Sequence, residues 1–140
     1  MVYLGLDLGS KTLGLSISDK TSIIATSLTV IRYNTYEDLF NELDSIVYTK
    51  HVDAFVLGNP LNLDGSVSKR SEMTFEFKKL LEDRYPTKEV ILQDERLSTV
   101  EAERMLINND TRRKNRKKVI DKIAATIILQ AYLDKRSHEK

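Results

Sequence analysis

Carboxylates at three positions are the residues of this chain best suited to carry chemistry. Asp7 interrupts an apolar run with strand-like alternation, Glu95 follows a second apolar run, and Asp121 lies near the start of an apolar run with helical spacing. A carboxylate among apolar residues is costly to bury unless it is paired, hydrogen-bonded or bound to a metal ion. If the fold brings the three together, they form an oxygen-only ligand set, which favours Mg²⁺ or Mn²⁺. Two such ions, roughly 3.5–4 Å apart, can stabilise the attacking and leaving oxygens of a phosphoryl displacement.

Each of these acids also has a structural interpretation. Asp7 precedes the turn Gly9-Ser10-Lys11-Thr12 and could cap it. The adjacent acids Asp94 and Glu95 stand at a strand-to-helix junction, where such a pair is often an ordinary loop charge. Asp121 falls in the first turn of the predicted last helix, where a carboxylate interacts favourably with the helix dipole. The residues alone leave both interpretations open at each position.

The composition narrows the chemistry further. A chain of 140 residues fits a single domain, residues 1–140, and its 41% hydrophobic and 31% charged content suits a soluble globular protein. Cysteine is absent, and the two histidines, His51 and His138, lie far apart in the sequence, so a thiolate or imidazole metal site is excluded. No signal peptide or bilayer-length apolar run is recognisable, and we therefore expect a cytoplasmic location.

The net charge of +1 is unevenly distributed along the chain. Residues 112–140 hold ten Lys or Arg and three acids, whereas residues 1–111 hold twelve Lys or Arg and eighteen acids. A basic end on an acidic body favours a local contact with a polyanion. The basic segment at about 108–118 is predicted to be a mobile loop, either merely solvated or in contact with phosphate. Its candidate phosphate contacts are Arg112, Arg113, Lys114 and Arg116.

The spacing of apolar residues predicts an α/β fold. Five runs have the character of strands and cover residues 2–8, 13–19, 23–33, 53–58 and 90–93. Helices are predicted at about 36–50, around 73–85, from 98, and at roughly 119–135. The first three strands form an antiparallel meander, and the later two return through helices and so run parallel to the first. In this mixed five-stranded sheet, flanked by helices, the three acids can converge at one edge.

Four motifs in this order resemble the YqgF family, also called RuvX, which covers pre-16S ribosomal RNA nucleases and Holliday junction resolvases. They are Leu4–Thr12, Gly58-Asn59-Pro60 with Asp64-Gly65-Ser66, Asp94–Thr99, and Asp121 followed by Ala124-Ala125. The resemblance covers nearly the whole chain and implies the RNase H-like fold. It also implies that Asp7, Glu95 and Asp121 are the catalytic, metal-binding acids.

One feature departs from nucleases of this wider fold, which often carry their second acid on the fourth strand. Here that strand ends Leu57-Gly58-Asn59-Pro60, without an acid. The pair Asp94 and Glu95 would have to supply the missing carboxylate. The sequence leaves open which of the two does so.

The leading hypothesis is a Mg²⁺- or Mn²⁺-dependent nuclease that hydrolyses phosphodiester bonds in structured nucleic acid. Lys11 would contact a phosphate near Asp7, and Arg96 would bind phosphate, orient Glu95 or form a structural ion pair. A non-catalytic nucleic-acid-binding module is an alternative. The hairpin at Asp7 also resembles the phosphate loop of kinases and ATPases of the actin and sugar-kinase type, but that architecture needs two such domains.

Two cellular roles accompany the resemblance: processing of the 5′ end of pre-16S ribosomal RNA, and resolution of Holliday junctions. Symmetric resolution of a four-way junction needs two active sites related by a two-fold axis, and hence a dimer interface. The apolar residues of the predicted helices are all accounted for by packing on one sheet. The sequence therefore favours a monomer, and with it the processing of precursor RNA.

Overall fold

The computed structural model describes residues 1–60, 68–94 and 113–138, with the backbone alone described for 113–122 and for 138. Its centre is a five-stranded sheet in the order β3-β2-β1-β4-β5. The strands are β1 (Tyr3–Leu8), β2 (Thr12–Ser18), β3 (Ala25–Arg32), β4 (Ala54–Asn59) and β5 (Glu89–Asp94). β1, β2 and β3 pair antiparallel, while β4 is parallel to both β1 and β5. The predicted mixed sheet is confirmed.

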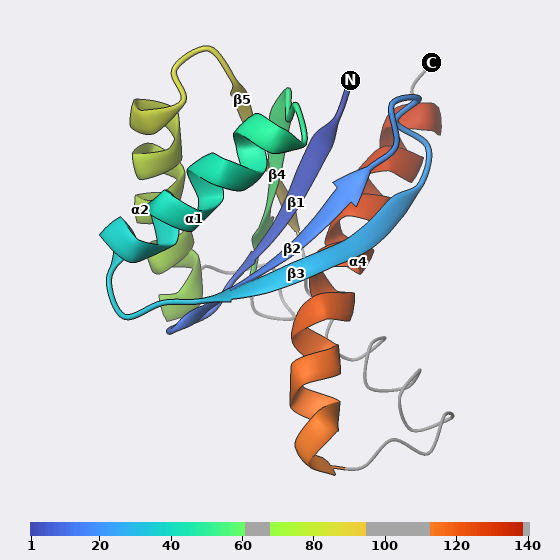
Figure 1. Cartoon of the computed structure of the whole chain (residues 1–140). Helices are drawn as coiled ribbons and strands as arrows, with labels where there is room; N and C mark the ends of the chain where they lie inside the picture. The colour runs from blue at the N-terminus through green and yellow to red at the C-terminus, as the bar shows by residue number, and fades with distance from the viewer. Residues whose placement is uncertain (61–67, 95–112, 139–140) are drawn as a thin grey trace.

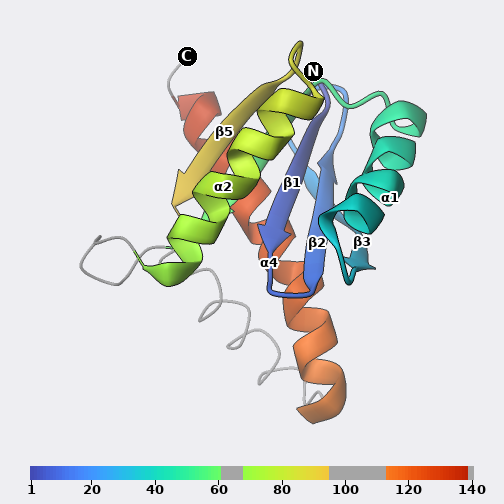
Figure 2. The same cartoon turned by 90° about the vertical axis from the view of Figure 1, so that its left-hand side faces the viewer.

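Helices cover both faces of this sheet. Helices α1 (Tyr36–Thr49) and α2 (Lys69–Arg84) lie on one face, and α4 (Arg113–His138) lies across the other (Figures 1 and 2). α1 and α2 are the crossovers that lead into the parallel strands β4 and β5, which a tight turn cannot connect. None of the helices in the described ranges is long and apolar enough to cross a membrane.

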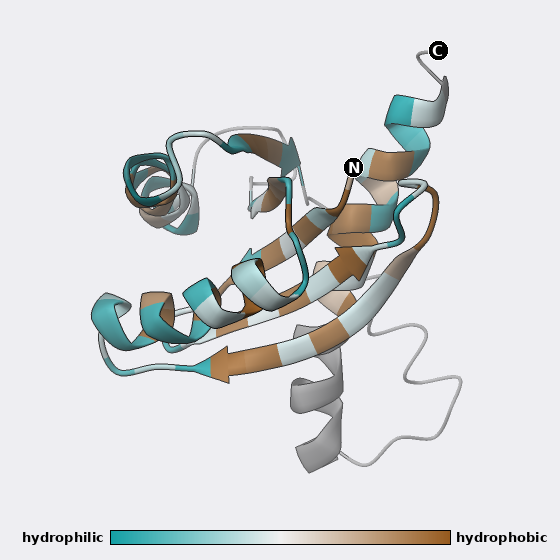
Figure 3. Cartoon of the chain, turned by 45° about the horizontal axis from the view of Figure 1, so that its top comes forward, coloured by the Kyte–Doolittle hydropathy of each residue, from teal (hydrophilic) through white to brown (hydrophobic). Residues whose placement is uncertain are grey.

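Two hydrophobic clusters hold the three layers together. The larger cluster joins the sheet to α1 and α2, and includes Leu4, Leu6, Leu15, Leu43, Phe55 and Phe77. The smaller cluster joins the other face of the sheet to α4, and consists of Tyr3, Ala54, Val56, Ile128, Leu129 and Leu133. Strand residues thus alternate between the two clusters, as the two-residue period of a strand requires. Figure 3 shows hydrophobic residues along the strands and hydrophilic ones over much of α1 and α2.

Helix α4 packs very closely on β1 at Gly5. A Cβ atom at this glycine would lie 2.3 Å from Ser16 Oγ and 2.7 Å from the Cβ of Leu129. The Ser16 hydroxyl donates a hydrogen bond of 2.7 Å to the carbonyl of Ala125 on α4, deep in the interface. Gly5 is therefore required for the close packing of α4 on the sheet, because any side chain there would push the helix away.

The start of α4 differs from its prediction. The helix begins at Arg113 rather than near Val119, so residues 113–118 are helical instead of part of a loop, and residues 108–112 lie outside the described ranges. Lys and Arg have high helix propensity. Like-charge repulsion at helical spacing costs only a few tenths of a kcal/mol per pair. Mutual repulsion was therefore the weaker of the two effects.

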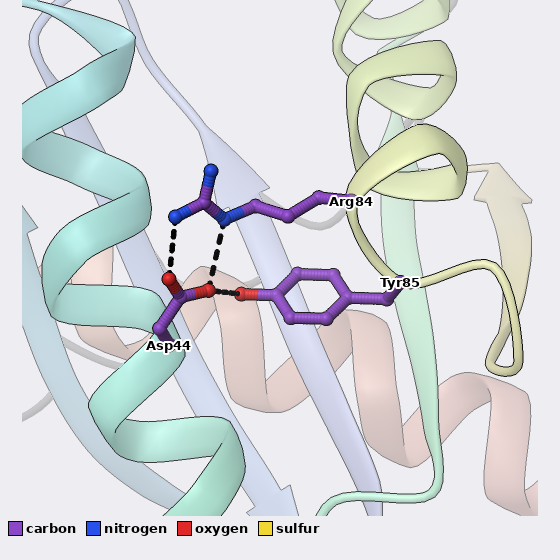
Figure 4. A network of polar contacts seen from close by, with 3 residues as sticks. All are labelled: Asp44, Arg84 and Tyr85. Carbon is purple, nitrogen blue, oxygen red and sulfur yellow. Dashed lines mark hydrogen bonds and ion pairs between the residues drawn. The ribbon is translucent and has the colours of Figure 1, made fainter.

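A polar network joins α1 to the carboxyl end of α2 (Figure 4). Arg84 donates through Nε to Asp44 Oδ1 at 2.9 Å, and its Nη2 reaches the second carboxylate oxygen. The hydroxyl of Tyr85 also donates to the Asp44 carboxylate. The guanidinium lies over the ring of Phe40, 5.1 Å from its centroid. The network ties the two helices together with every charge compensated.

Candidate active site

Asp7 lies within β1, opposite Gly14 of β2 in the antiparallel ladder, and is half-buried. Its neighbours Leu6 and Leu8 belong to the cluster under α1 and α2. Strand alternation therefore places Asp7 on the other face, on the α4 side of the sheet. The predicted position of Asp7 near the end of a core strand is confirmed.

Helix α4 runs antiparallel to β1 on that same face. The ring of Tyr132 contacts the ring of Tyr3 with centroids 5.4 Å apart, and Ala125 lies against Gly5. Residues earlier in α4 therefore lie beside residues later in β1. One helical turn advances about 5.4 Å and two strand residues about 6.6 Å. The turn that contains Asp121 thus lies in the direction that leads from Gly5 to Asp7.

The position of Asp121 in α4 corrects one interpretation. Because the helix begins at Arg113, Asp121 lies in its third turn and not in its first. The helix dipole acts mainly on the first and last turns, so it does not account for an acid at this position. Ala125 and Ile128, which follow Asp121 at helical spacing, are buried. The side chain of Asp121 itself lies outside the described part.

The end of β5 separates the two acids of the Asp94–Glu95 pair. Asp94 pairs with Asn59 of β4 and is exposed. Val90 and Leu92 contact the cluster under α1 and α2, which places Asp94 on that same face and away from the face of Asp7. Glu95 lies outside the described residues.

Asn59 ends β4 at the same edge, and sequence reasoning named it within a family motif without giving its side chain a role. Its side chain is 7% exposed, and its Oδ1 has no hydrogen-bond partner in the part of the chain that the structure describes. A buried polar atom left unpaired costs about 1–3 kcal/mol. The available signal was a polar residue closing an otherwise apolar strand, directly before Pro60.

The turn between β1 and β2 is held from the side of β3. Gly9 N donates to the carbonyl of Thr12 at 2.7 Å, which closes the turn. Tyr33, just beyond β3, donates through its hydroxyl to the carbonyl of Gly9 at 2.6 Å and through its backbone N to the carbonyl of Lys11 at 3.0 Å. Burial raises the pKa of Tyr33 to about 12, so the hydroxyl remains a donor. The side chain of Lys11 is exposed on this fixed turn.

The first turn of α2 is attached to the same edge, which Figure 2 shows beside the carboxyl ends of β1 and β5. Ser68 caps the helix, and the hydroxyls of Ser68 and Ser71 both donate to the carbonyl of Pro60. Arg70 donates from Nη2 to the carbonyl of Leu8 at 3.2 Å. The edge therefore combines the end of β1, the end of β4 and the start of α2.

The other predicted site residues are placed only in part. Arg113, Lys114 and Arg116 lie in the first turns of α4, while Glu95, Arg96 and Arg112 lie outside the described residues. Among described residues, no group of three or more His, Cys, Asp or Glu side chains is arranged to hold a metal ion. Because two of the three predicted acids have no described side chain, their convergence stays a prediction.

A family model of RuvX, described as "Holliday junction resolvase", matches residues 1–135. The chain belongs to the RuvX family. Similar proteins span almost the same length. A Geobacillus protein named "Putative pre-16S rRNA nuclease" is 46% identical over 97% of this chain and 99% of its own. A Bacillus subtilis protein of the same name is 46% identical over 96% of this chain and 98% of its own.

Solved structures show the same fold as this RuvX family chain at low sequence identity. Thermus thermophilus RuvC, solved with a Holliday junction substrate, has a TM-score of 0.56 at 13% identity, covering 98% of this chain and 96% of its own. Fowlpox virus resolvase, solved with junction DNA, has a TM-score of 0.55 at 15% identity, covering 97% and 99%. The predicted RNase H-like fold is confirmed.

Proposed function

We propose that this protein is a divalent-metal-dependent nuclease that processes the 5′ end of pre-16S ribosomal RNA in the cytoplasm. The observation that carries the proposal is the half-buried carboxylate of Asp7 near the end of the central strand, on the face along which α4 leads toward Asp121. Membership of the RuvX family and the names of its relatives support the same activity.

Asp7, Glu95 and Asp121 are the residues proposed to hold Mg²⁺ or Mn²⁺, and we propose two ions. The chemistry of this edge suits a hard cation, because the half-buried Asp7 offers carboxylate oxygen and cysteine is absent from the chain. When bound, such an ion stabilises the negative charge that develops on the phosphate oxygens. The chain itself contributes a fixed carboxylate on a core strand and an adjacent turn that presents Lys11.

The alternation of β5 supports Glu95 over Asp94 as the second acid. Asp94 is directed to the α2 side of the sheet, whereas Asp7 is directed to the α4 side. The residue after Asp94 is the first that a continuing strand would turn toward Asp7. On this argument, Asp94→Asn leaves cleavage close to that of the unaltered protein, and Glu95→Gln abolishes it.

Positive side chains on three elements are proposed to bind the nucleic-acid backbone. Lys11 would contact phosphate close to Asp7, and Arg96 would follow the second acid. The remaining contacts come from the start of α4 and the residue before it, namely Arg112, Arg113, Lys114 and Arg116. The family description makes branched DNA the second candidate substrate, with this protein as a Holliday junction resolvase.

We propose a monomer, which suits single cuts in a precursor RNA better than paired cuts in a junction. The most exposed large apolar side chains next to one another among the described residues are Ile23 and Ile24, at 63% and 59%. Two residues in a short turn offer far less than the roughly 1,200–2,000 Å² that a stable interface buries in total. Light scattering with and without junction DNA measures the mass directly.

The proposed function is tested by offering two substrates side by side. The protein is incubated with Mg²⁺ and either a 5′-extended pre-16S RNA fragment or a synthetic four-way DNA junction, and Asp7→Asn serves as the inactive control. We expect cleavage of the RNA at its 5′ side and an intact junction. Paired symmetric nicks in the junction, with the RNA untouched, would assign the resolvase role instead. No cleavage of either substrate would leave only a binding module.

A further inference from the structure

Arg70 is an arginine at the candidate site that has no acidic partner among the described residues. Its Nη2 lies 3.2 Å from the carbonyl oxygen of Leu8, the residue that follows Asp7 in β1. Its side chain is exposed, and it forms no ion pair with any residue in the described ranges. The guanidinium is thus held at the end of β1 by a neutral carbonyl, and no acid among the described residues compensates its charge.

Arg84, at the other end of the same helix, shows what a structural arginine looks like in this protein. Both carboxylate oxygens of Asp44 accept from Arg84, and the guanidinium also lies over an aromatic ring. A guanidinium has five N–H donors in a planar fork that matches carboxylate or phosphate. Arg84 uses this fork within the protein, whereas among the described residues the guanidinium of Arg70 donates to a backbone carbonyl.

The attachment of α2 keeps Arg70 in this place. Ser68 and Ser71 both hold the carbonyl of Pro60, so the first turn of the helix is fixed to the end of β4. On the neighbouring turn, the backbone of Lys11 is fixed by Tyr33, whose N donates to the Lys11 carbonyl and whose hydroxyl donates to the Gly9 carbonyl. Two exposed cations are therefore held on either side of the carboxyl end of β1.

We propose that Arg70 binds a backbone phosphate of the substrate next to the one that is cleaved. The proposal rests on the proposed nuclease function. Asp7 faces the α4 side of the sheet and Arg70 approaches the same strand end from the α2 side, so a nucleic-acid strand that crosses this edge meets both. Because Arg70 stands away from the face of the carboxylates, its interaction with phosphate contributes to binding and not to the chemical step.

Binding is measured with a fluorescein-labelled RNA hairpin in EDTA, over a series of salt concentrations. Arg70→Gln removes the charge but retains a donor for the Leu8 carbonyl. We expect several-fold weaker binding and a log-log salt slope shallower by about one unit, the change expected when one phosphate is no longer neutralised. In the cleavage assay KM rises and kcat changes by less than about twofold, as expected for uniform binding. Lys79→Ala, an exposed cation more than two turns further along α2, is the matched control and leaves the slope unchanged.

Two results would overturn this role for Arg70. One is a salt slope in Arg70→Gln equal to that of the unaltered protein. The other is a fall in kcat with an unchanged KM, which would make Arg70 a support for the end of β1. Both leave the cleavage of RNA by the unaltered protein in place. Failure of the proposed function is a separate result, namely no cleavage with Mg²⁺ or Mn²⁺ whatever residue stands at position 70.

Discussion

The two ends of α2 differ in how their polar groups are used. At the carboxyl end, Arg84, Asp44 and Tyr85 satisfy one another in a closed network (Figure 4). At the amino end, and within the described residues, the Arg70 guanidinium contacts a backbone carbonyl and no acid, and the buried Oδ1 of Asn59 has no hydrogen-bond partner. Charges that stabilise a fold are compensated inside it, whereas charges that serve a ligand are left available. The comparison separates the end of α2 that stabilises the fold from the end that we propose binds substrate.

The largest expected effect on cleavage is that of Asp7→Asn, at the carboxyl end of β1. The change removes one negative charge with almost no change in volume, so metal binding weakens while packing persists. We expect cleavage to fall by at least about 10²-fold, as for the loss of an electrostatic catalytic group. Rates are measured in a metal-titrated assay, together with the melting temperature in metal-free buffer. A melting temperature that collapses with the change would make Asp7 a structural residue.

The second effect is on affinity, through the basic start of α4. Replacing Arg112, Arg113 and Lys114 together with Ala should weaken binding of many sequences about equally. The salt slope should become shallower by about one log-log unit for each phosphate that these side chains neutralise in the unaltered protein. Fluorescence anisotropy over a salt series measures both quantities. A slope that stays the same would mean that these side chains are merely solvated.

The third effect is on stability, and it tests the close packing of α4 on β1. In Gly5→Ala the new Cβ meets Ser16 Oγ at 2.3 Å and the backbone carbonyl of Ala125 at 3.0 Å, so the helix must shift. We expect a loss of about 1–3 kcal/mol in the free energy of unfolding, the usual cost of overpacking. Because α4 also carries Asp121, cleavage should fall as well. A denaturation midpoint equal to that of the unaltered protein would show that α4 is not held closely at Gly5.

The smallest effect is at the far end of α2. Hydrogen bonds from Arg84, and then from Tyr85, hold the pKa of Asp44 below its ordinary value. Asp44→Asn should therefore cost at most about 1 kcal/mol, since the pair is partly exposed and screened by solvent. Cleavage and the salt slope of binding should remain unchanged. A loss of activity without a loss of stability would contradict the division between the two ends of α2.

The pH dependence of this pair follows from the direction of the shift. A lowered pKa in the folded protein means that the unfolded chain takes up the proton first on acidification. The stabilisation is therefore complete above the unfolded pKa of about 3.9 and is lost as the pH falls through the folded value. The difference in stability between the unaltered protein and Asp44→Asn should shrink below about pH 4, as followed by urea denaturation.

The fold was accessible from the sequence because the signals were local. Alternating apolar residues indicated the strands, and apolar residues at helical spacing indicated the helices. In the structure Thr35 caps α1, where its hydroxyl accepts from the backbone N of Asp38 at 3.2 Å. The extent of α4 was missed because repulsion among its cations was overestimated against their helix propensity. On α2, Leu80 is 38% exposed although its apolar neighbours Phe77 and Leu81 are buried, since helical spacing does not fix the width of a buried stripe.

The candidate site was less accessible, because most of its parts depend on tertiary contacts. Asp7 was identified as a charge out of place in an apolar strand. Arg70 and Tyr33 carry no such signal, since their roles come from carbonyl oxygens far away in the chain. Asn59 gains its meaning only from burial without a partner among the described residues. Sequence patterns report local periodicity, and a site assembled from a strand end, a turn and a helix start exceeds their range.

The central claim is that Asp7, Glu95 and Asp121 hold divalent metal together at the edge of the sheet. A crystal structure with Mn²⁺ and an RNA fragment tests it most directly, because the anomalous signal of manganese locates the ions. We expect manganese bound by these three carboxylates, with Asp94 turned to the other face of the sheet. Manganese bound elsewhere, or with Asp7 outside its ligands, would contradict the claim.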